Sequence, residues 1–364
     1  MSLYYFLTGT GKVRYPALIL SVCLGLIFCV AINVQAAGKQ TSPEFAFIGD
    51  MPYNAKQKKQ FMNLMQEIDA ANLGFVVHAG DYWFDGIAWK ESTKGLPPCG
   101  DETMQDRLNM AKKSKHPFII TPGDNDWTDC YRAKPHAYDP LERLAKLRSM
   151  FFQGDKSLGQ HKIKLTRQSE NKKYSMYREN ARWTYGNVLF VTLNMVGSNN
   201  NLGRSPEMDA EYKARNEANL AWMDEAFAIA KRDGLRAVML IAQANPQFET
   251  RWTPKLKKRY LLGGLGIKPS KENRTTGFSD FLSALEEHVI DFGKPVVYAH
   301  GDTHTFRIDK PLVDSINHRM IENFTRVETF GFPDTHWIRV IIDPDDPNVF
   351  QFRQEIVNKN RVEH

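Results

Sequence analysis

The sequence predicts an α/β protein built as a layered sandwich of helices and sheets. Short apolar runs typical of buried strands alternate with amphipathic helical segments over most of the chain. Residues 327–357 alternate instead between apolar and polar side chains around a DPDDP turn, which is typical of antiparallel strands. The composition, 42% hydrophobic and 25% charged over 364 residues, excludes collagen, coiled-coil and low-complexity classes. The net charge of +6 is too small to indicate a nucleic-acid partner.

The elements of the first half follow from apolar runs and helical periodicity. Residues 44–50, EFAFIGD, form a continuous apolar run that ends in Gly-Asp and predicts a buried strand. The same pattern recurs at 74–81 and 117–124. Helices are expected at 55–72, 101–115 and 138–152, and the polar stretch that follows, to about 173, is expected to be a loop.

The second half begins with two strand-like runs in residues 181–195, separated by Gly186-Asn187, which is a hairpin signal. A long helix is expected at 207–234, because apolar side chains recur on one face until Gly234. The remaining elements before the antiparallel tail are strands at 235–245 and 294–302, with a helix at 279–292 between them.

The first 36 residues differ from the rest of the chain. They carry two positive charges, Lys12 and Arg14, and no acidic residue, and an apolar run follows. Because that run ends in the A-x-A-like Val34-Gln35-Ala36, residues 1–36 predict a secretory signal peptide. Residues 37–364 then form one domain, exported to the periplasm or outside the cell. The alternative is an uncleaved anchor that associates with a membrane through residues 16–34.

Two of the four cysteines lie in this leader, so the mature chain keeps only Cys99 and Cys130. An even pair in an exported protein suggests one disulfide, and both cysteines lie in loops that follow expected strands. The alternative is two unrelated thiols. Asn273 and Asn323 each begin a glycosylation sequence.

Polar side chains follow five of the expected strands. Ligands bind at the carboxyl ends of strands in open α/β sheets, so this position suggests a site. A glycine before each Asp lets the chain turn at once and approach a bound ion. Carboxylates that converge in one cleft repel one another, and a cation relieves that repulsion. The sequence therefore predicts a metal site among Asp50, Asp81, Asp124, Asp302 and the strand-end amides Gln243 and Asn245.

This order of motifs resembles the calcineurin-like metallophosphoesterases, the superfamily that includes the purple acid phosphatases. That family shows Asp-x-His, then Gly-Asp, then Gly-Asn-His-Asp/Glu, then a strand ending in His, then Gly-His-x-His. The resemblance covers roughly residues 44–355 and implies a four-layer α/β/β/α sandwich.

The resemblance also implies a set of metal ligands. Asp50 and Asp81 match the family outright, with Asp81 in the position that bridges two ions. Asp124 and Asp302 stand where the family has an Asn and a His. The remaining implied ligands are His304, which matches the last His, and Gln243 or Asn245 in place of the strand-end His, with Gln243 preferred.

Two departures from the family pattern affect the chemistry. Pro52 replaces the His of the first motif, and nearby Tyr53 is an alternative ligand. Asn125 replaces the His that assists the leaving group in the family. The leaving group must then be a good one, or its proton must come from Asp126, His78 or His300.

The implied ligands are mostly oxygen atoms, which suit Mn²⁺, Mg²⁺, iron or Ca²⁺ better than Zn²⁺. The resemblance implies two divalent ions and a bridging hydroxide that attacks the phosphorus of a small phosphoester or phosphorylated polymer. The sequence thus predicts an exported, metal-dependent phosphoester hydrolase. The alternative is a catalytically inactive exported module of the same fold that binds a phosphorylated or anionic partner.

Residues 251–274 are rich in Lys and Arg. They are either a solvated surface insert or a basic rim of the site that attracts phosphate.

Overall fold

The computed structural model describes residues 42–84, 96–253 and 276–362. The predicted signal peptide at 1–36 and residues 254–274 of the basic segment lie outside the described residues. Within the described ranges, no helix combines the length and apolar character needed to cross a membrane.

Five strands form the first sheet, in the order β12-β11-β1-β2-β3. The strands β1 (Glu44–Ile48), β2 (Val76–His78) and β3 (Phe118–Ile120) run parallel to one another. The last two strands of the chain, β11 (Trp337–Ile342) and β12 (Phe350–Glu355), extend this sheet antiparallel. Because β1, β2 and β3 are parallel, the residues that follow them lie at one edge of the sheet.

Seven strands form the second sheet, in the order β4-β5-β6-β7-β8-β10-β9. Its centre is parallel from β6 to β10, and both of its edges are antiparallel. The strands are β4 (Thr166–Arg167), β5 (Ala181–Tyr185), β6 (Val188–Thr192), β7 (Ala237–Ile241), β8 (Val296–His300), β9 (Arg307–Asp309) and β10 (Phe324–Glu328).

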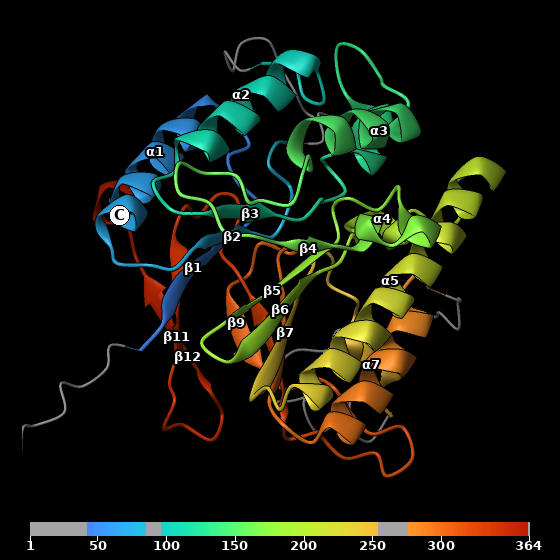
Figure 1. Ribbon diagram of the computed structural model, residues 1–364. Helices are drawn as coiled ribbons and strands as arrows, with labels where there is room; N and C mark the ends of the chain where they lie inside the picture. The colour runs from blue at the N-terminus through green and yellow to red at the C-terminus, as the bar shows by residue number, and fades with distance from the viewer. Residues whose placement is uncertain (1–41, 85–95, 254–275, 363–364) are drawn as a thin grey trace, which may run out of the picture. The chain divides into compact units, whose positions relative to one another are not determined.

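Helices cover the outer face of each sheet (Figure 1). The first sheet carries α1 (Ala55–Ala70), α2 (Asp101–Lys113) and α3 (Pro140–Phe151). The second carries α5 (Pro206–Arg232) and α7 (Ser279–Phe292).

The starts of three helices carry side-chain caps that the sequence signals. The side chains of Asn54, Asp139 and Ser205 accept hydrogen bonds from first-turn backbone N–H groups of α1, α3 and α5. Proline at the first position of α3 and of α5 fits the same rule.

Three apolar layers fill the space between these elements. In β1, Phe45 and Phe47 face the second sheet, whereas Ala46 and Ile48 face the helices α1 to α3. Side chains alternate across a strand in this way, so a strand covered on both faces is apolar throughout. The predicted four-layer α/β/β/α sandwich is therefore confirmed.

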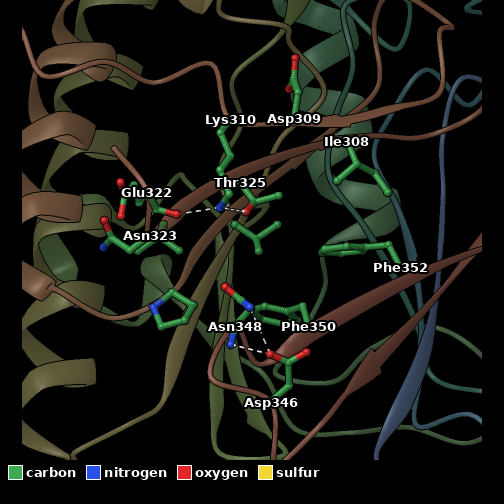
Figure 2. Close-up of a pocket in the computed structure, with 13 residues that line it drawn as sticks. Ile308, Asp309, Lys310, Glu322, Asn323, Thr325, Asp346, Asn348, Phe350 and Phe352 are labelled. Carbon is green, nitrogen blue, oxygen red and sulfur yellow. Dashed lines mark hydrogen bonds between the residues drawn. The ribbon is translucent and has the colours of Figure 1, made fainter. Parts of the chain in front are cut away.

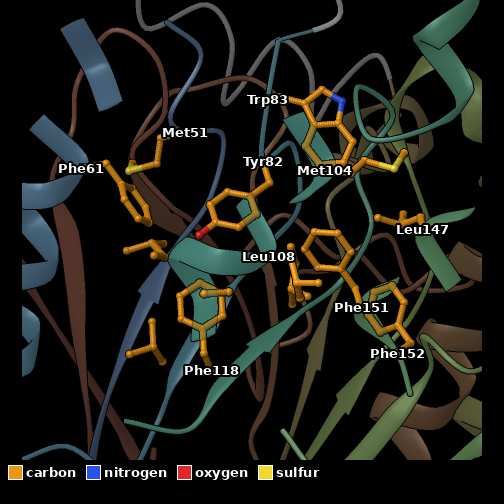
Figure 3. Close-up of a cluster of buried hydrophobic side chains, with 14 of the residues drawn as sticks. Met51, Phe61, Tyr82, Trp83, Met104, Leu108, Phe118, Leu147, Phe151 and Phe152 are labelled. Carbon is orange, nitrogen blue, oxygen red and sulfur yellow. The ribbon is translucent and has the colours of Figure 1, made fainter. Parts of the chain in front are cut away.

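The loops that leave β1 and β2 are anchored in the core beneath α1, α2 and α3. Figure 3 shows Met51, Tyr82 and Trp83 among the apolar side chains of this cluster. Each is at most 2% exposed. Since Met51 follows Asp50 and Tyr82 follows Asp81, the core fixes the backbone that carries these two acids.

The antiparallel prediction for the tail holds on only one side of its first strand. The strand β10 begins at Phe324 and pairs antiparallel with the short edge strand β9, but it pairs parallel with β8. A local alternation of side chains reports burial of one face but not the direction of the neighbouring strand. The stretch up to residue 173 was expected to be a loop and contains the two-residue edge strand β4.

Candidate functional site

The structure brings the predicted site residues of both sheets together. In the first sheet, one aspartate follows each of the strands β1, β2 and β3. In the second sheet, Gln243 follows β7, and Asp302 and His304 follow β8. Direct contacts join the two sets. The backbone N–H of Asp302 lies 3.1 Å from both carboxylate oxygens of Asp50, and the Gln243 side-chain nitrogen lies 3.2 Å from Asp81 Oδ2. The cluster thus contains Asp50, Asp81, Asp124, Gln243, Asp302 and His304.

Four residues of this cluster have a left-handed backbone. The φ angles are 52° at Asp50, 55° at Asp81, 82° at Asp302 and 61° at His304. Positive φ is uncommon for residues other than glycine and costs conformational energy. Such outliers cluster at functional sites, where the surrounding fold holds them in place.

The glycines before these acids serve a different purpose from the one expected. Gly123 and Gly301 do not adopt the left-handed backbone themselves. They leave room for a carboxylate from a neighbouring strand, because a Cβ at Gly123 would lie 2.0 Å from Asp81 Oδ1. A Cβ at Gly301 would lie 2.0 Å from Asp50 Oδ2. The expected turn glycine is found only before Asp81, where Gly80 has φ of 94°.

Tyr53 lies at the centre of one side of the site. Its hydroxyl is 3.1 Å from Asp81 Oδ2, 3.2 Å from His304 Nε2 and 3.2 Å from the Asn125 side-chain nitrogen. His304 Nε2 is also 3.7 Å from Asp50 Oδ1. Tyr53 was expected only as an alternative ligand, and its spacing of three residues from Asp50 is the signal that the sequence offers for this central position.

Gln243 lies at the centre of the other side and is fully buried. Its Oε1 accepts a hydrogen bond from the Gly197 backbone N–H at 2.6 Å. Its Nε2 donates to Asp81 Oδ2 at 3.2 Å and to Asp124 Oδ1 at 3.1 Å. The other amide considered for this position, Asn245, contacts Asp302 through its backbone N–H at 2.7 Å.

Asp126 lies behind the site and ties two of its loops together. Its carboxylate accepts the backbone N–H groups of Asp81 at 2.9 Å, Tyr82 at 2.8 Å and Gly123 at 2.8 Å. This buried carboxylate therefore fixes the backbone on both sides of Asp81 and Asp124.

The two strand histidines are buried, and the hydrogen bonds they make are to backbone groups. His78 joins the loops after β1 and β2, since its Nε2 is 2.8 Å from the Met51 carbonyl and its Nδ1 accepts the Gly80 N–H. Burial lowers the pKa of His78 to about 3. His300 Nδ1 contacts the Gly301 carbonyl at 2.6 Å, and its Nε2 lies 3.9 Å from Glu328. Burial lowers the pKa of His300 well below the usual range.

The four acids of the cluster destabilise one another as anions. Burial, followed by repulsion from Asp124, raises the pKa of Asp302 to about 8. Burial, followed by repulsion from Asp129, raises the pKa of Asp124 to about 6. Burial also raises the pKa values of Asp50 and Asp81 well above the usual range, and neighbouring carboxylates add to both rises. Bound positive charge would reverse this balance.

The donor chemistry of the cluster fits a divalent cation, because carboxylate oxygens from four strand ends converge in a buried space with one imidazole. In the part of the chain that the structure describes, no three His, Cys, Asp or Glu side chains are arranged as a ready ligand set. Their oxygens instead accept hydrogen bonds from Tyr53, Gln243 and backbone N–H groups.

The predicted disulfide between Cys99 and Cys130 is confirmed. It joins the residue before the Gly100 cap of α2 to the 3₁₀ helix Thr128–Arg132, and both cysteines are buried. The two sulfur atoms lie 3.5 Å and 3.6 Å from the Asn125 carbonyl oxygen. The disulfide thus braces the backbone that carries Asn125.

Figure 2 shows a pocket of about 430 Å³, lined by Val296 and Val297 at the start of β8. The site residues Asp302 and His304 follow the other end of this strand. Lys310 is the basic side chain in it, and its Nζ donates to the Glu322 carbonyl and to Thr325 Oγ1. The glycosylation residue Asn323 also lines this pocket, with its side-chain nitrogen 2.9 Å from two backbone carbonyls. The predicted site residues do not line this pocket.

The comparisons with known proteins give similarity of structure only. No family model matches the sequence, and no curated protein matches it. The structure of PhoD is similar with a TM-score of 0.49 at 10% identity, over 86% of this chain and 69% of that chain. A 5'-nucleotidase from Candida albicans SC5314 is similar with a TM-score of 0.42 at 9% identity, over 88% of this chain and 52% of that chain. This chain therefore spans about half the length of the nucleotidase.

Proposed function

We propose that this chain is a metal-dependent phosphoester hydrolase. The observation that carries the proposal is the convergence of four carboxylates from both sheets, all at strand carboxyl ends. Asp50, Asp81 and Asp124 are buried and Asp302 is half-buried, and three of the four have a left-handed backbone. A fold that holds mutually repelling acids in strained conformations gains from a bound cation, and strand ends of α/β sheets are where ligands bind.

Asp50, Asp81 and His304 would hold a cation on the Tyr53 side of the site, and Asp124 and Asp302 face Asp81 from the other side. A divalent cation there would supply Lewis-acid stabilisation of the charge that develops on the phosphoryl oxygens. The oxygen-rich ligands favour Mn²⁺, Mg²⁺, Ca²⁺ or iron over Zn²⁺.

Asn125 and Tyr53 supply neutral donors beside the carboxylates. The Asn125 amide and the Tyr53 hydroxyl lie 3.2 Å apart, so both can donate to an oxygen of a bound phosphoryl group. The Asn125 amide can donate a hydrogen bond, but it is too weak an acid to protonate a leaving group. Asp126 and His300 lie behind the ligand loops, where they hold the backbone. We therefore expect esters with good leaving groups to be the better substrates.

Hydrolysis of an aryl phosphate monoester and an aryl phosphate diester with added Mn²⁺ tests the proposal. We expect turnover that a chelator abolishes and added metal restores. Asp81→Asn should lower kcat/KM by about 10²-fold or more, because it removes the charge that faces both halves of the site. The matched control is Asp155→Asn on the exposed surface, which should change nothing.

Metal-stimulated turnover that survives Asp81→Asn would rule out this assignment. A protein that binds no cation and hydrolyses nothing on a broad panel of substrates would instead be the non-catalytic module that binds an anionic partner.

The disulfide supports export, because disulfides persist in oxidising compartments. Fractionation of cells and sequencing of the mature N-terminus test export and cleavage of the leader.

A further inference from the structure

Gln243 has an amide whose orientation is fixed by the backbone. Its Oε1 is 2.6 Å from the Gly197 nitrogen, and a backbone N–H can only donate. Turning the amide over would place its own NH₂ group against that N–H and leave two buried donors facing each other. The carbonyl oxygen of Gln243 is therefore committed to Gly197 and does not face the carboxylates.

The backbone that carries this N–H is held firmly in place. Four residues after Gly197 have positive φ, from 49° at Ser198 to 67° at Asn201. The turn is secured by Asn200, whose side chain accepts from Arg215 at 2.6 Å and donates to the Gly277 carbonyl at 2.9 Å. A Cβ at Gly197 would lie 2.5 Å from Asp124 Oδ2, so this turn and the site are also in close contact.

The NH₂ group of Gln243 points into the space between three acids. It donates to Asp81 at 3.2 Å and to Asp124 at 3.1 Å. Asp302 lies beside the same turn, since a Cβ at Gly197 would lie 2.9 Å from its Oδ1. A cation shared by Asp81, Asp124 and Asp302 needs the space that this nitrogen fills.

We infer that Gln243 is a positioning residue that replaces a second ion, so that the chain binds one divalent cation, on the side of Asp50, Asp81 and His304. The inference rests on the proposed function, because it assumes that the cluster binds a cation. The N–H groups of Gln243 hold Asp81 and Asp124 at a fixed separation, which is the structural task of the second ion in a two-metal site.

Two measurements on the metal-stripped full-length protein loaded with Mn²⁺ test the inference without using activity. Equilibrium dialysis should give one tightly bound Mn²⁺ per chain. Electron paramagnetic resonance spectra, recorded with one equivalent of Mn²⁺ per chain and with excess Mn²⁺, should show an isolated bound ion and no spin-coupled pair. Two bound ions with a spin-coupled signal would overturn the inference and leave the proposed function standing. No bound ion would overturn both.

A charge-introducing variant tests the role of Gln243 itself. In Gln243→Glu, one carboxylate oxygen can still accept the Gly197 N–H while the other adds a ligand in place of the NH₂ group. We expect the bound Mn²⁺ to rise to two per chain with a spin-coupled signal. The control is Gln247→Glu, the same change at an exposed position four residues later in the chain. This variant should still bind one Mn²⁺ per chain. A count of one in Gln243→Glu would overturn the assignment, and the wild-type count decides the question even if this variant does not fold.

Discussion

The acids of the site occupy backbone conformations that few side chains adopt. Asp50, Asp81 and Asp302 have φ between 52° and 82°, and each lies two or three residues beyond the end of a buried strand. A plain turn would use glycine or asparagine at such positions, since they adopt this backbone at lower cost. Aspartate at all three indicates that the carboxylate itself is required.

Tyr53 links the ligand side chains, and its removal tests that role. Tyr53→Phe keeps the ring and removes the hydroxyl that contacts Asp81, His304 and Asn125. We expect Mn²⁺ affinity, measured by titration calorimetry, to fall by about 10- to 100-fold, because outer partners orient ligands. Tyr131→Phe is the control, because Tyr131 is 47% exposed, and it should bind normally. Unchanged affinity in Tyr53→Phe would show that the hydroxyl does not organise the ligands.

The turns after the strands depend on close contact between neighbouring strand ends. A Cβ at Gly123 would lie 2.0 Å from Asp81 Oδ1 and 2.4 Å from its backbone nitrogen. Gly123→Ala should therefore shift the β2 or β3 loop, lower the free energy of unfolding by about 1–3 kcal/mol and weaken Mn²⁺ binding. Urea unfolding and titration calorimetry measure both effects.

Gly100→Ala is the matched control for this steric prediction. Gly100 has an ordinary φ of −67°, and a Cβ there would meet its nearest atoms at 3.4 Å. We expect normal Mn²⁺ binding and a smaller loss of stability, set by the helix cap it occupies. If Gly123→Ala behaved like Gly100→Ala, close packing of the strand ends would not be what shapes the site.

The disulfide joins α2 to the loop after β3, with a separation of 31 residues between its cysteines. The double variant Cys99→Ala/Cys130→Ala should lose about 2–4 kcal/mol of unfolding free energy, because the unfolded chain gains freedom. Urea unfolding should show this loss, and a reductant should lower the stability of the wild type but not of the double variant. Equal midpoints for the two proteins would mean that the disulfide does not stabilise the fold.

At the scale of the whole molecule, the buried acids make the metal-free protein sensitive to pH. The folded-state pKa values of about 6 for Asp124, 7 for Asp126 and 8 for Asp302 all lie above their values in the unfolded chain. The folded state therefore holds more protons than the unfolded state, so stability falls as pH rises through these values. The pKa of histidine in the unfolded chain is about 6.5, so from about pH 7.5 upward the buried histidines are neutral in both states and do not oppose this trend.

The melting temperature of the chelator-treated protein should accordingly fall between pH 7.5 and pH 9, as measured by scanning calorimetry. Saturating Mn²⁺ should reduce the slope, because the cation stabilises the ionised carboxylates that high pH creates. A flat or rising melting temperature in the metal-free protein would contradict the burial of these acids in one cluster.

Sequence reasoning predicted the layers and the strand-end acids because both depend on local patterns. The apolar run of β1 and the Gly-Asp after it are visible without a structure. The parallel pairing of β10 with β8 was missed, because a local pattern does not show which strand lies beside it or in which direction that strand runs. The orientation of Gln243 was missed for the same reason, since Gly197 lies 46 residues away and has no motif. The spacing of motifs along the sequence predicted that these residues lie together. Which atom of Gln243 faces the carboxylates depends on its hydrogen bond to Gly197, which the sequence does not show.

Anomalous X-ray diffraction from crystals of the protein grown or soaked with Mn²⁺ tests the central claim most directly. The account predicts a manganese peak in contact with carboxylate oxygens of Asp50 and Asp81 and with His304 Nε2, and no such peak in Asp81→Asn. Crystals that show no manganese at this cluster, or manganese bound only elsewhere, would contradict it.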